Sequence, residues 1–305
     1  MQPAGQPVPR KQLIVCADDF GLDVAVNEAV EAGCRDGILT CASLMVGAPA
    51  AADAVERARR LPALRVGLHV VLVDGAPVLP PEQVPDLVGS DGRFDRRLVR
   101  AGFRFFFLPA VRRQLEREIR AQFEAFRATG LPLDHVNAHN HMHLHPTVAG
   151  LILRIGRAFG ARAVRVPREP RAVIDAAEGR GGGAGQGGSR GFSPLDLWTG
   201  LLRRRLAAAG MAVNDNVFGL AWSGAMTEER VLSLVDRLPD GVSELYFHPA
   251  TRRTPPLVRA MPDYRHADEF AALVSGEVRR RVEASGARLV SYGDLVPAAA
   301  ATAAS

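Results

Sequence analysis

Histidine at every second position of one short segment is the strongest chemical signal in the sequence. The segment from His139 to His145 has the order His-Asn-His-Met-His-Leu-His and precedes Pro146. Residues two apart share one face of an extended chain, and neutral imidazole is the commonest metal ligand in proteins. We expect metal binding or catalysis here. A polar loop is the alternative, and the four rings need not all be ligands, because the chain turns toward a helix.

Acidic and basic side chains also follow apolar runs elsewhere in the chain. Asp18 and Asp19 come directly after one run, His69 lies in another, Arg165 lies in a third and His248 follows a fourth. The carboxyl ends of parallel strands meet on one face of a barrel, so these groups are expected to form one site. Taken singly, the aspartates could cap a helix, and each histidine could be a core or surface residue.

The donor types predict a particular chemistry. One carboxylate and two imidazoles leave coordination positions open, which is typical of a catalytic metal rather than a structural one. Such a metal lowers the pKa of water toward about 7, while a second carboxylate serves as base and a separate histidine as acid. We therefore predict a hydrolase with one divalent ion. Imidazole ligands favour zinc, and manganese, cobalt, nickel or magnesium remain alternatives.

Apolar runs alternate with helical patterns along the whole chain. Continuous apolar runs predict buried parallel strands, at residues 13–17, 39–46, 65–72, 135–138, 163–166, 213–220, 244–247 and 288–291. Helical spacing and end signals predict helices, at residues 23–37, 50–60, 109–130, 146–159, 194–209, 227–238 and 267–285. The alternation predicts a single-domain α/β fold, a distorted (β/α) TIM-like barrel of seven or eight strands. An open doubly wound sheet is the second choice of fold. No GxGxxG motif follows the first strand, which counts against a dinucleotide-binding fold.

Two segments interrupt this rhythm. Residues 73–108 are Pro-rich and then rich in arginine and phenylalanine, and residues 179–191 are too glycine-rich for regular structure. We interpret both as insertions in a barrel that spans residues 12–297. Residues 1–11 and 298–305 are expected to be flexible.

Composition narrows the function classes. The 305 residues are 47% hydrophobic and include three cysteines, too few for a disulfide framework or zinc cluster. No apolar run is long enough to span a membrane. The net charge of +5 comes with few aromatic residues and no nucleic-acid motif, so we predict no nucleic-acid partner. A cytoplasmic protein is expected, and a homo-oligomer remains open.

The motifs resemble those of the YdjC/ChbG-type carbohydrate deacetylases. The matching residues are Ala17-Asp18-Asp19-Phe20-Gly21, Gly67-Leu68-His69, Asn137 to Pro146, and Phe247-His248-Pro249. The resemblance implies a distorted barrel that removes acetyl groups from N-acetylated amino sugars with a divalent metal. It implies metal ligands at Asp19, His69 and His139, a base at Asp18, an acid at His248, and substrate contact near Arg165, His141 and His143. The family often has Asp-Ser-His-His-His where this chain has Asn137-Ala138-His139-Asn140-His141.

A narrower resemblance is to the hopanoid-biosynthesis-associated (HpnK) branch. It rests on the Arg/Phe insertion at 93–108 and on residues 217–224. It implies an N-acetylglucosaminyl hopanoid as substrate, with free amino sugar and acetate as products. Phe105, Phe106 and their neighbours could cover a lipid tail or contact a bilayer at the inner membrane face, or pack internally. Soluble chito-oligosaccharides are the alternative substrate, and a non-catalytic binding protein is a third interpretation.

Overall fold

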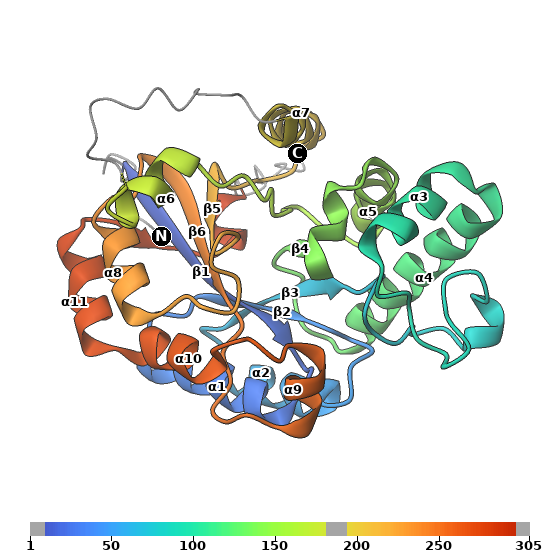
Figure 1. The fold of residues 1–305 in the computed structure, drawn as a ribbon, viewed down its shortest axis with the longest axis horizontal. Coiled ribbons are helices and arrows are strands. Elements are labelled where there is room, and N and C mark those ends of the chain that lie inside the picture. The colour runs from blue at the N-terminus through green and yellow to red at the C-terminus, as the bar shows by residue number, and fades with distance from the viewer. Residues whose placement is uncertain (1–9, 181–193, 297–305) are drawn as a thin grey trace, which may run out of the picture.

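A curled, wholly parallel sheet forms the centre of the molecule (Figure 1). The computed structural model describes residues 10–180 and 194–296, so the predictions for residues 1–9, 181–193 and 297–305 lie outside the described residues. The strands are β1 (Lys11–Phe20), β2 (Cys41–Leu44), β3 (Arg65–Val70), β4 (Val136–Ala138), β5 (Asn216–Phe218), β6 (Gly241–Phe247) and β7 (Arg288–Leu289).

Strand β1 is the axis of this sheet. The order is β4-β3-β2-β1-β6-β5, and β7 pairs with the start of β1. Beyond β4, isolated parallel bridges join Val136 to Val164 and Ala163 to Ala212, which continues the curl toward closure. The predicted distorted (β/α) barrel is therefore confirmed, with seven strands in the described part of the chain.

Helices cover the outside of the sheet. They are α1 (Val24–Asp36), α2 (Ala51–Arg60), α3 (Leu98–Phe107), α4 (Pro109–Ala128), α5 (Pro146–Ala158), α6 (Arg171–Ala177), α7 (Pro194–Ala208), α8 (Glu228–Val235), α9 (Pro255–Ala260), α10 (His266–Val274) and α11 (Gly276–Ala284). Short 3₁₀ turns are η1 (Pro81–Gln83), η2 (His139–Leu144) and η3 (Gly293–Leu295). In Figure 1, α3, α4 and α5 gather on one side and α8, α10 and α11 on the other. Within the described ranges, none of the helices has the length and apolar character needed to cross a bilayer.

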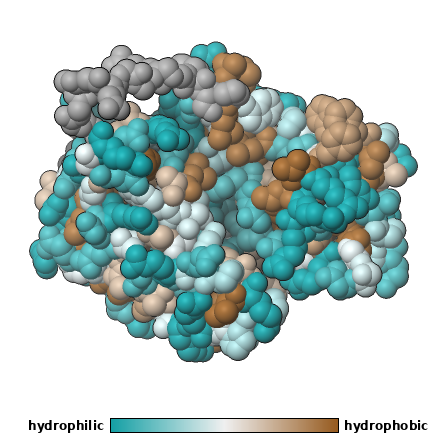
Figure 2. All heavy atoms as spheres, viewed as in Figure 1, coloured by the Kyte–Doolittle hydropathy of each residue, from teal (hydrophilic) through white to brown (hydrophobic). Residues whose placement is uncertain are grey.

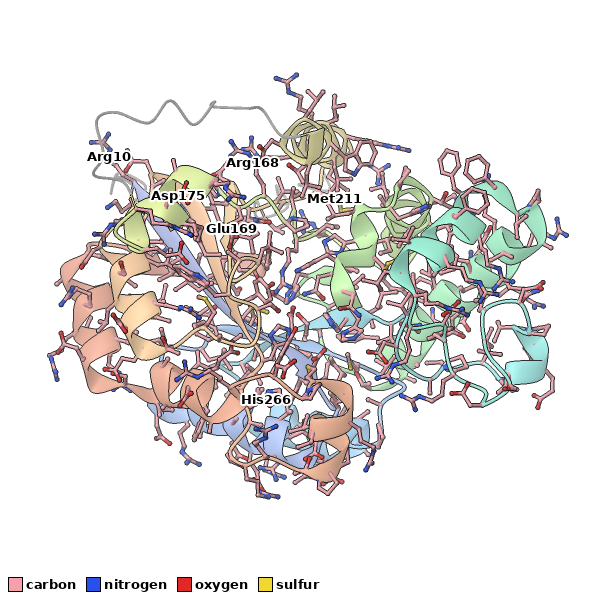
Figure 3. The ribbon with its side chains drawn as sticks, viewed as in Figure 1. Arg10, Arg168, Glu169, Asp175, Met211 and His266 are labelled. Atoms are coloured by element: carbon pink, nitrogen blue, oxygen red, sulfur yellow. The ribbon has the colours of Figure 1, made fainter. Side chains whose placement is uncertain are left out.

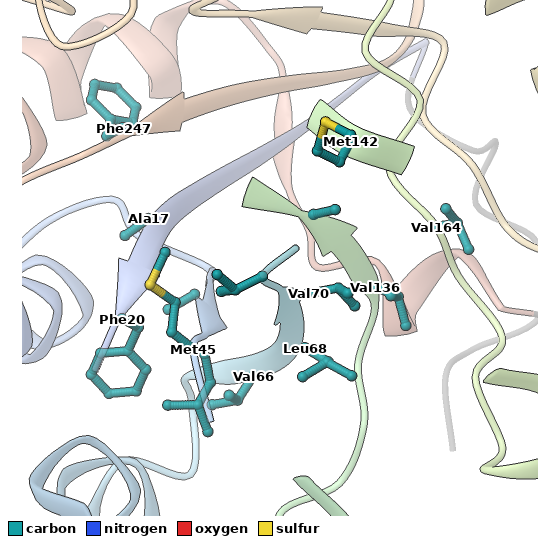
Figure 4. Packing of buried hydrophobic residues seen from close by; sticks show 14 of the residues in the cluster. Ala17, Phe20, Met45, Val66, Leu68, Val70, Val136, Met142, Val164 and Phe247 are labelled. Atoms are coloured by element: carbon teal, nitrogen blue, oxygen red, sulfur yellow. The ribbon is translucent and has the colours of Figure 1, made fainter. Parts of the chain in front are cut away.

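Apolar residues from the strand faces and helices form the main core. Ala17, Phe20, Leu68 and Phe247 belong to it and are fully buried (Figure 4). Strand β1 is buried along almost its whole length, as its continuous apolar run predicts. A rigid, buried β1 fixes the position of the two aspartates near its end.

Several elements differ from the sequence prediction, among them the short helices α6 and α9, which were not predicted. The expected strand at 163–166 is reduced to the isolated bridges described above. The expected helix at 267–285 is two helices, because Ser275 leaves the helical conformation and its hydroxyl accepts hydrogen bonds from Glu277 N and Val278 N at the start of α11. The insertion at 73–108 contains the regular helix α3.

Gly67 on β3 provides a test of the close packing beneath the site. A Cβ at this position would lie 2.5 Å from the ring of the fully buried His135, whereas a Cβ at Gly200 in α7 meets nothing within 4 Å. Gly67→Ala should lower the free energy of unfolding by about 1–3 kcal/mol through overpacking. Gly200→Ala should raise it by up to about 1 kcal/mol through helix propensity. Urea unfolding measures both, and a neutral Gly67→Ala would contradict the packing.

Candidate metal centre

Three side chains converge at the carboxyl edge of the sheet. Asp19 Oδ1 lies 3.3 Å from His69 Nε2 and 3.1 Å from His139 Nδ1. One donor atom from each residue lies within 4.8 Å of the others. The second carboxylate oxygen, Oδ2 of Asp19, is buried and has no hydrogen-bond partner within the described structure. The three predicted metal ligands are thus brought together.

Strand ends explain this convergence. Asp19 lies in β1, His69 in β3, and His139 directly follows β4. Asp19 has a φ of 61°, a left-handed conformation rare for a residue other than glycine. Asn140 and His141 are left-handed too, with φ of 51° and 52°. The chain therefore turns sharply after His139, and the alternation of the histidines does not persist.

Asn137 orients the metal-facing nitrogen of His69. The two residues are register partners on β4 and β3, and His69 Nδ1 donates to Asn137 Oδ1 at 2.7 Å. Asn137 Nδ2 donates to Asp18 Oδ1 at 3.0 Å and to Ser43 Oγ at 2.9 Å, which fixes the amide orientation. The lone pair of His69 Nε2 is then left for a cation, the usual arrangement around a metal-binding histidine. The sequence analysis named Asn137 only as part of the histidine motif and did not predict this role.

Asp18 lines the same cavity as His69 and His139 and is held by a buried arginine. Arg165 Nη1 and Nη2 donate to its two oxygens at 2.5 and 2.9 Å. The same guanidinium also donates to Glu244, with Nη2 at 2.6 Å from Oε1. Burial alone would raise the pKa of Asp18, but the charge and hydrogen bonds of Arg165, together with the charges of His69 and His248, outweigh it and hold that pKa well below its usual range. Asp18 is therefore ionised at neutral pH.

His248, after β6, is held by its backbone. Its N–H donates to the buried Glu269 carboxylate. Its carbonyl accepts a 2.6 Å hydrogen bond from His266 Nδ1, on the residue that begins α10 (Figure 3). Burial lowers the pKa of His248 to about 4, with the His139 and His69 charges acting in the same direction. The ring is thus neutral at pH 7. Neither Glu269 nor His266 was identified from the sequence.

These groups line one cavity of ≈ 280 Å³. Its walls include Asp18, His69, His139 and His248, and further lining comes from His141, Tyr246, Tyr264 and Leu220. The loop at Leu220 is held by Glu169, whose carboxylate accepts from three successive backbone N–H groups (Figure 3). Four of the five predicted catalytic and metal residues therefore line one small cavity, and the fifth, Asp19, contacts His69 and His139 from outside its lining.

The predicted substrate contacts are distributed differently. His141 lines the cavity and lies 3.2 Å from the Tyr246 hydroxyl. Arg165, His143 and Phe105 are buried and are not part of the cavity lining. Phe106 is 45% exposed and lies against His145, outside the cavity. Arg165 is thus placed beneath Asp18, where it acts on the carboxylate.

A second donor group lies deeper in the barrel. Cys16 and Cys41 are register partners on β1 and β2, and their sulfurs lie with His135 in a group within 4.8 Å. His135 is already hydrogen-bonded to Asp134 and Ser43, each at 2.9 Å. The spacing of the cysteines in the sequence gave no sign of this cluster, because strand pairing creates it.

The donor set of Asp19, His69 and His139 fits a divalent cation. The unpartnered Asp19 Oδ2 and the oriented His69 Nε2 are both buried and lie in a group of mixed oxygen and nitrogen donors. Three protein donors leave positions for substrate or water, as in catalytic zinc sites. Fold and donors together define a (β/α)-barrel protein with a group of donors that fits a divalent ion.

The chain belongs to the YdjC-like family: residues 12–284 match the family described as YdjC-like protein. A carbohydrate deacetylase of Geobacillus stearothermophilus is 29% identical over 280 residues, 92% of this chain and 96% of that protein. A carbohydrate deacetylase of Brevibacillus brevis is 38% identical over 148 residues, 48% of this chain and 56% of the relative. The predicted family is confirmed, and the predicted enzyme class agrees with the names of these relatives.

A solved structure supports the fold over nearly the whole chain. An Enterococcus faecalis protein, described as a candidate cellobiose-phosphate cleavage protein, superposes with a TM-score of 0.72. It is 25% identical, and the match covers 94% of this chain and 99% of that chain. These similarities show the family and do not separate its branches.

Proton competition at His139 gives a test of the metal centre. Burial lowers the pKa of His139, but the charge and hydrogen bond of Asp19, together with the charges of Asp74 and Asp18, outweigh burial and raise that pKa above its ordinary value of 6.5. Because a ligand must lose its proton to bind metal, zinc affinity should fall about tenfold per pH unit below that raised pKa. Calorimetric titration in buffers of different ionisation heat measures the proton released. His139→Gln should abolish most binding, and His145→Gln should leave it unchanged. Unchanged zinc binding by His139→Gln would contradict the site.

Proposed function

We propose that this protein is a metal-dependent carbohydrate N-deacetylase that hydrolyses the acetamide of an N-acetylated amino sugar. One observation carries the proposal. The donors of Asp19, His69 and His139 meet beside an ionised Asp18 and a neutral His248. His69, His139, Asp18 and His248 line the same cavity. The names of the family relatives support the carbohydrate substrate.

The metal ligands would be Asp19, His69 and His139. A divalent ion held there supplies Lewis-acid polarisation of the amide carbonyl. Asn137 keeps His69 in the tautomer that presents Nε2. Asp19 is buried, and the charge and hydrogen bond of His139 keep its pKa well below its ordinary value, so it stays an anionic ligand.

Asp18 and His248 move the protons. Asp18 is ionised at neutral pH and accepts a proton from the attacking water. Neutral His248 must gain a proton before it can act as an acid, and Asp18, which lines the same cavity, passes on the proton that it accepted from the water. His248 then protonates the leaving nitrogen as the carbon–nitrogen bond breaks. The products are acetate and the free amine, with one water consumed.

Arg165 acts on the base. It binds both Asp18 and Glu244, so its charge is shared between two carboxylates. A guanidinium bound by Asp18 alone would weaken the base further, because each opposite charge lowers its proton affinity. Tyr292 also donates to Glu244 at 2.6 Å. This buried group holds Asp18 in one orientation toward the cavity.

Within the class of N-acetylated amino sugars, we propose an N-acetylglucosaminyl hopanoid as the substrate. A cavity of ≈ 280 Å³ is at the lower end of small-ligand pockets, so it admits a sugar unit and leaves a large aglycone outside. The segment 93–108 places exposed phenylalanines near the histidine segment, which suits a lipid-linked sugar at a membrane surface. The alternative substrate is a soluble chito-oligosaccharide, which the carbohydrate deacetylase relatives favour.

Acetate release separates these substrates. We expect faster release from N-acetylglucosaminyl hopanoid in mixed vesicles than from chito-oligosaccharides at equal sugar concentration. Chelation should stop both reactions, and added zinc should restore them. A higher kcat/KM for the soluble sugars would reject the lipid-linked substrate and retain the deacetylase. No release from either would reject the deacetylase itself.

Substitution of Asp18 tests the base. Asp18→Asn keeps the shape of the side chain and removes its charge, so kcat should fall about 10²–10⁴-fold, the usual contribution of general acid–base catalysis. Zinc stoichiometry should not change, because the ligands are other residues. Val258→Ala, an exposed position on α9, serves as the control. A variant with full metal and full rate would show that Asp18 is not the base.

A further inference from the structure

Helix α3 exposes a row of large apolar side chains. Val99 is 88% exposed, Phe103 61% and Phe107 58%, and the rings of Phe103 and Phe107 are 4.5 Å apart. Phe106 is also exposed. At 3.6 residues per turn, these four side chains fall within an arc of about 100°. The opposite face carries the buried Ala101 and Phe105, so α3 is anchored on the protein by one face only.

Arginines border this apolar row. Arg100 and Arg104 follow it on one side of the helix wheel. Their ion pairs are long, with Arg100 at 3.6 Å from Asp95 and Arg104 at 3.8 Å from Asp86. An exposed apolar face with arginines at its edge is typical of a helix that lies in the interface of an anionic bilayer.

The helix is directly connected to the histidine segment. The rings of Phe105 and Phe106 lie 6.1 and 6.0 Å from that of His145. His145 precedes α5 and directly follows η2, which contains His139. Any surface that α3 contacts therefore lies near the chain that carries a metal ligand.

Helix α7 reaches the same segment from another side. Trp198 Nε1 donates to the carbonyl of Leu144 at 2.7 Å, while Leu197 and Leu201 of this helix are 59% and 50% exposed. Figure 2 shows apolar side chains on the surface over α7 and over the side formed by α3 to α5. Two helices with exposed apolar side chains, α3 and α7, thus flank the segment from His139 to His145.

We propose that α3 and α7 form a docking surface for an anionic lipid bilayer, with Val99, Phe103 and Phe107 inserted among the headgroups. The inference rests on the proposed function in one respect: docking would place the cavity next to a lipid-linked sugar. The surface itself follows from exposure and charge and does not require that substrate.

A second copy of the chain is a poorer occupant. In a symmetric dimer this patch would bring the arginines of α3 close to a second chain that also carries a net charge of +5. Like charges brought together in this way oppose association. Anionic headgroups neutralise them instead, and the net charge of +5 acts in the same direction.

Vesicle co-sedimentation of the full chain tests the surface without substrate. The wild type should bind vesicles of phosphatidylcholine with phosphatidylglycerol more strongly than vesicles of phosphatidylcholine alone, and salt should weaken the difference. The triple variant V99S/F103S/F107S should bind at least tenfold less, while it keeps deacetylation of soluble sugars. R100Q/R104Q should lose mainly the preference for anionic lipid.

Control variants make the result decisive. V24S/L289S replaces two less exposed apolar side chains elsewhere, 40% and 39% exposed, and should bind like the wild type. Asp18→Asn should also bind vesicles normally, so failed catalysis and failed docking are distinguishable. Equal binding by the triple variant, or no binding by the wild type, would overturn the proposal. So would a wild-type dimer in light scattering that V99S/F103S/F107S converts to a monomer.

Discussion

Two adjacent buried carboxylates near the end of the central strand are the constraint on which the site depends. Asp18 and Asp19 are 2% and 1% exposed, and burial of two neighbouring charges is costly unless each has its own compensation. The left-handed conformation of Asp19 separates them. Asp18 pairs with Arg165, and Asp19 meets His69 and His139. This separation allows the two proposed roles, with Asp18 as the base and Asp19 as a metal ligand.

Asn137 connects the group around Asp18 with the group around Asp19. It accepts from His69 and donates to Asp18, so one amide sets the tautomer of a ligand and the position of the base. The Ser43 hydroxyl is hydrogen-bonded to both Asn137 and His135. His135 is in turn hydrogen-bonded to Asp134, just before β4. A continuous hydrogen-bonded path therefore runs through the barrel from Asp134 to His69.

The sequence allowed prediction of the parts that local patterns determine. The buried apolar run of β1 and the position of His69 on β3 predicted that Asp19, His69 and His139 would lie together, because the rule for strand ends is general. The roles of Arg165, Glu244 and Asn137 depend on which side chains meet inside the barrel, and no local pattern encodes that. The break at Ser275 was missed for a related reason: the helical spacing continues on both sides of it, and only the cap shows the interruption.

X-ray absorption spectroscopy of the zinc-loaded protein tests the central claim most directly, because it identifies the donor atoms. The account predicts one zinc per chain with oxygen and nitrogen neighbours only, and with the outer scattering of two imidazoles. His69→Ala should remove one imidazole contribution. A sulfur shell would place the ion at Cys16, Cys41 and His135 and would contradict the catalytic site, as would a protein that binds no zinc.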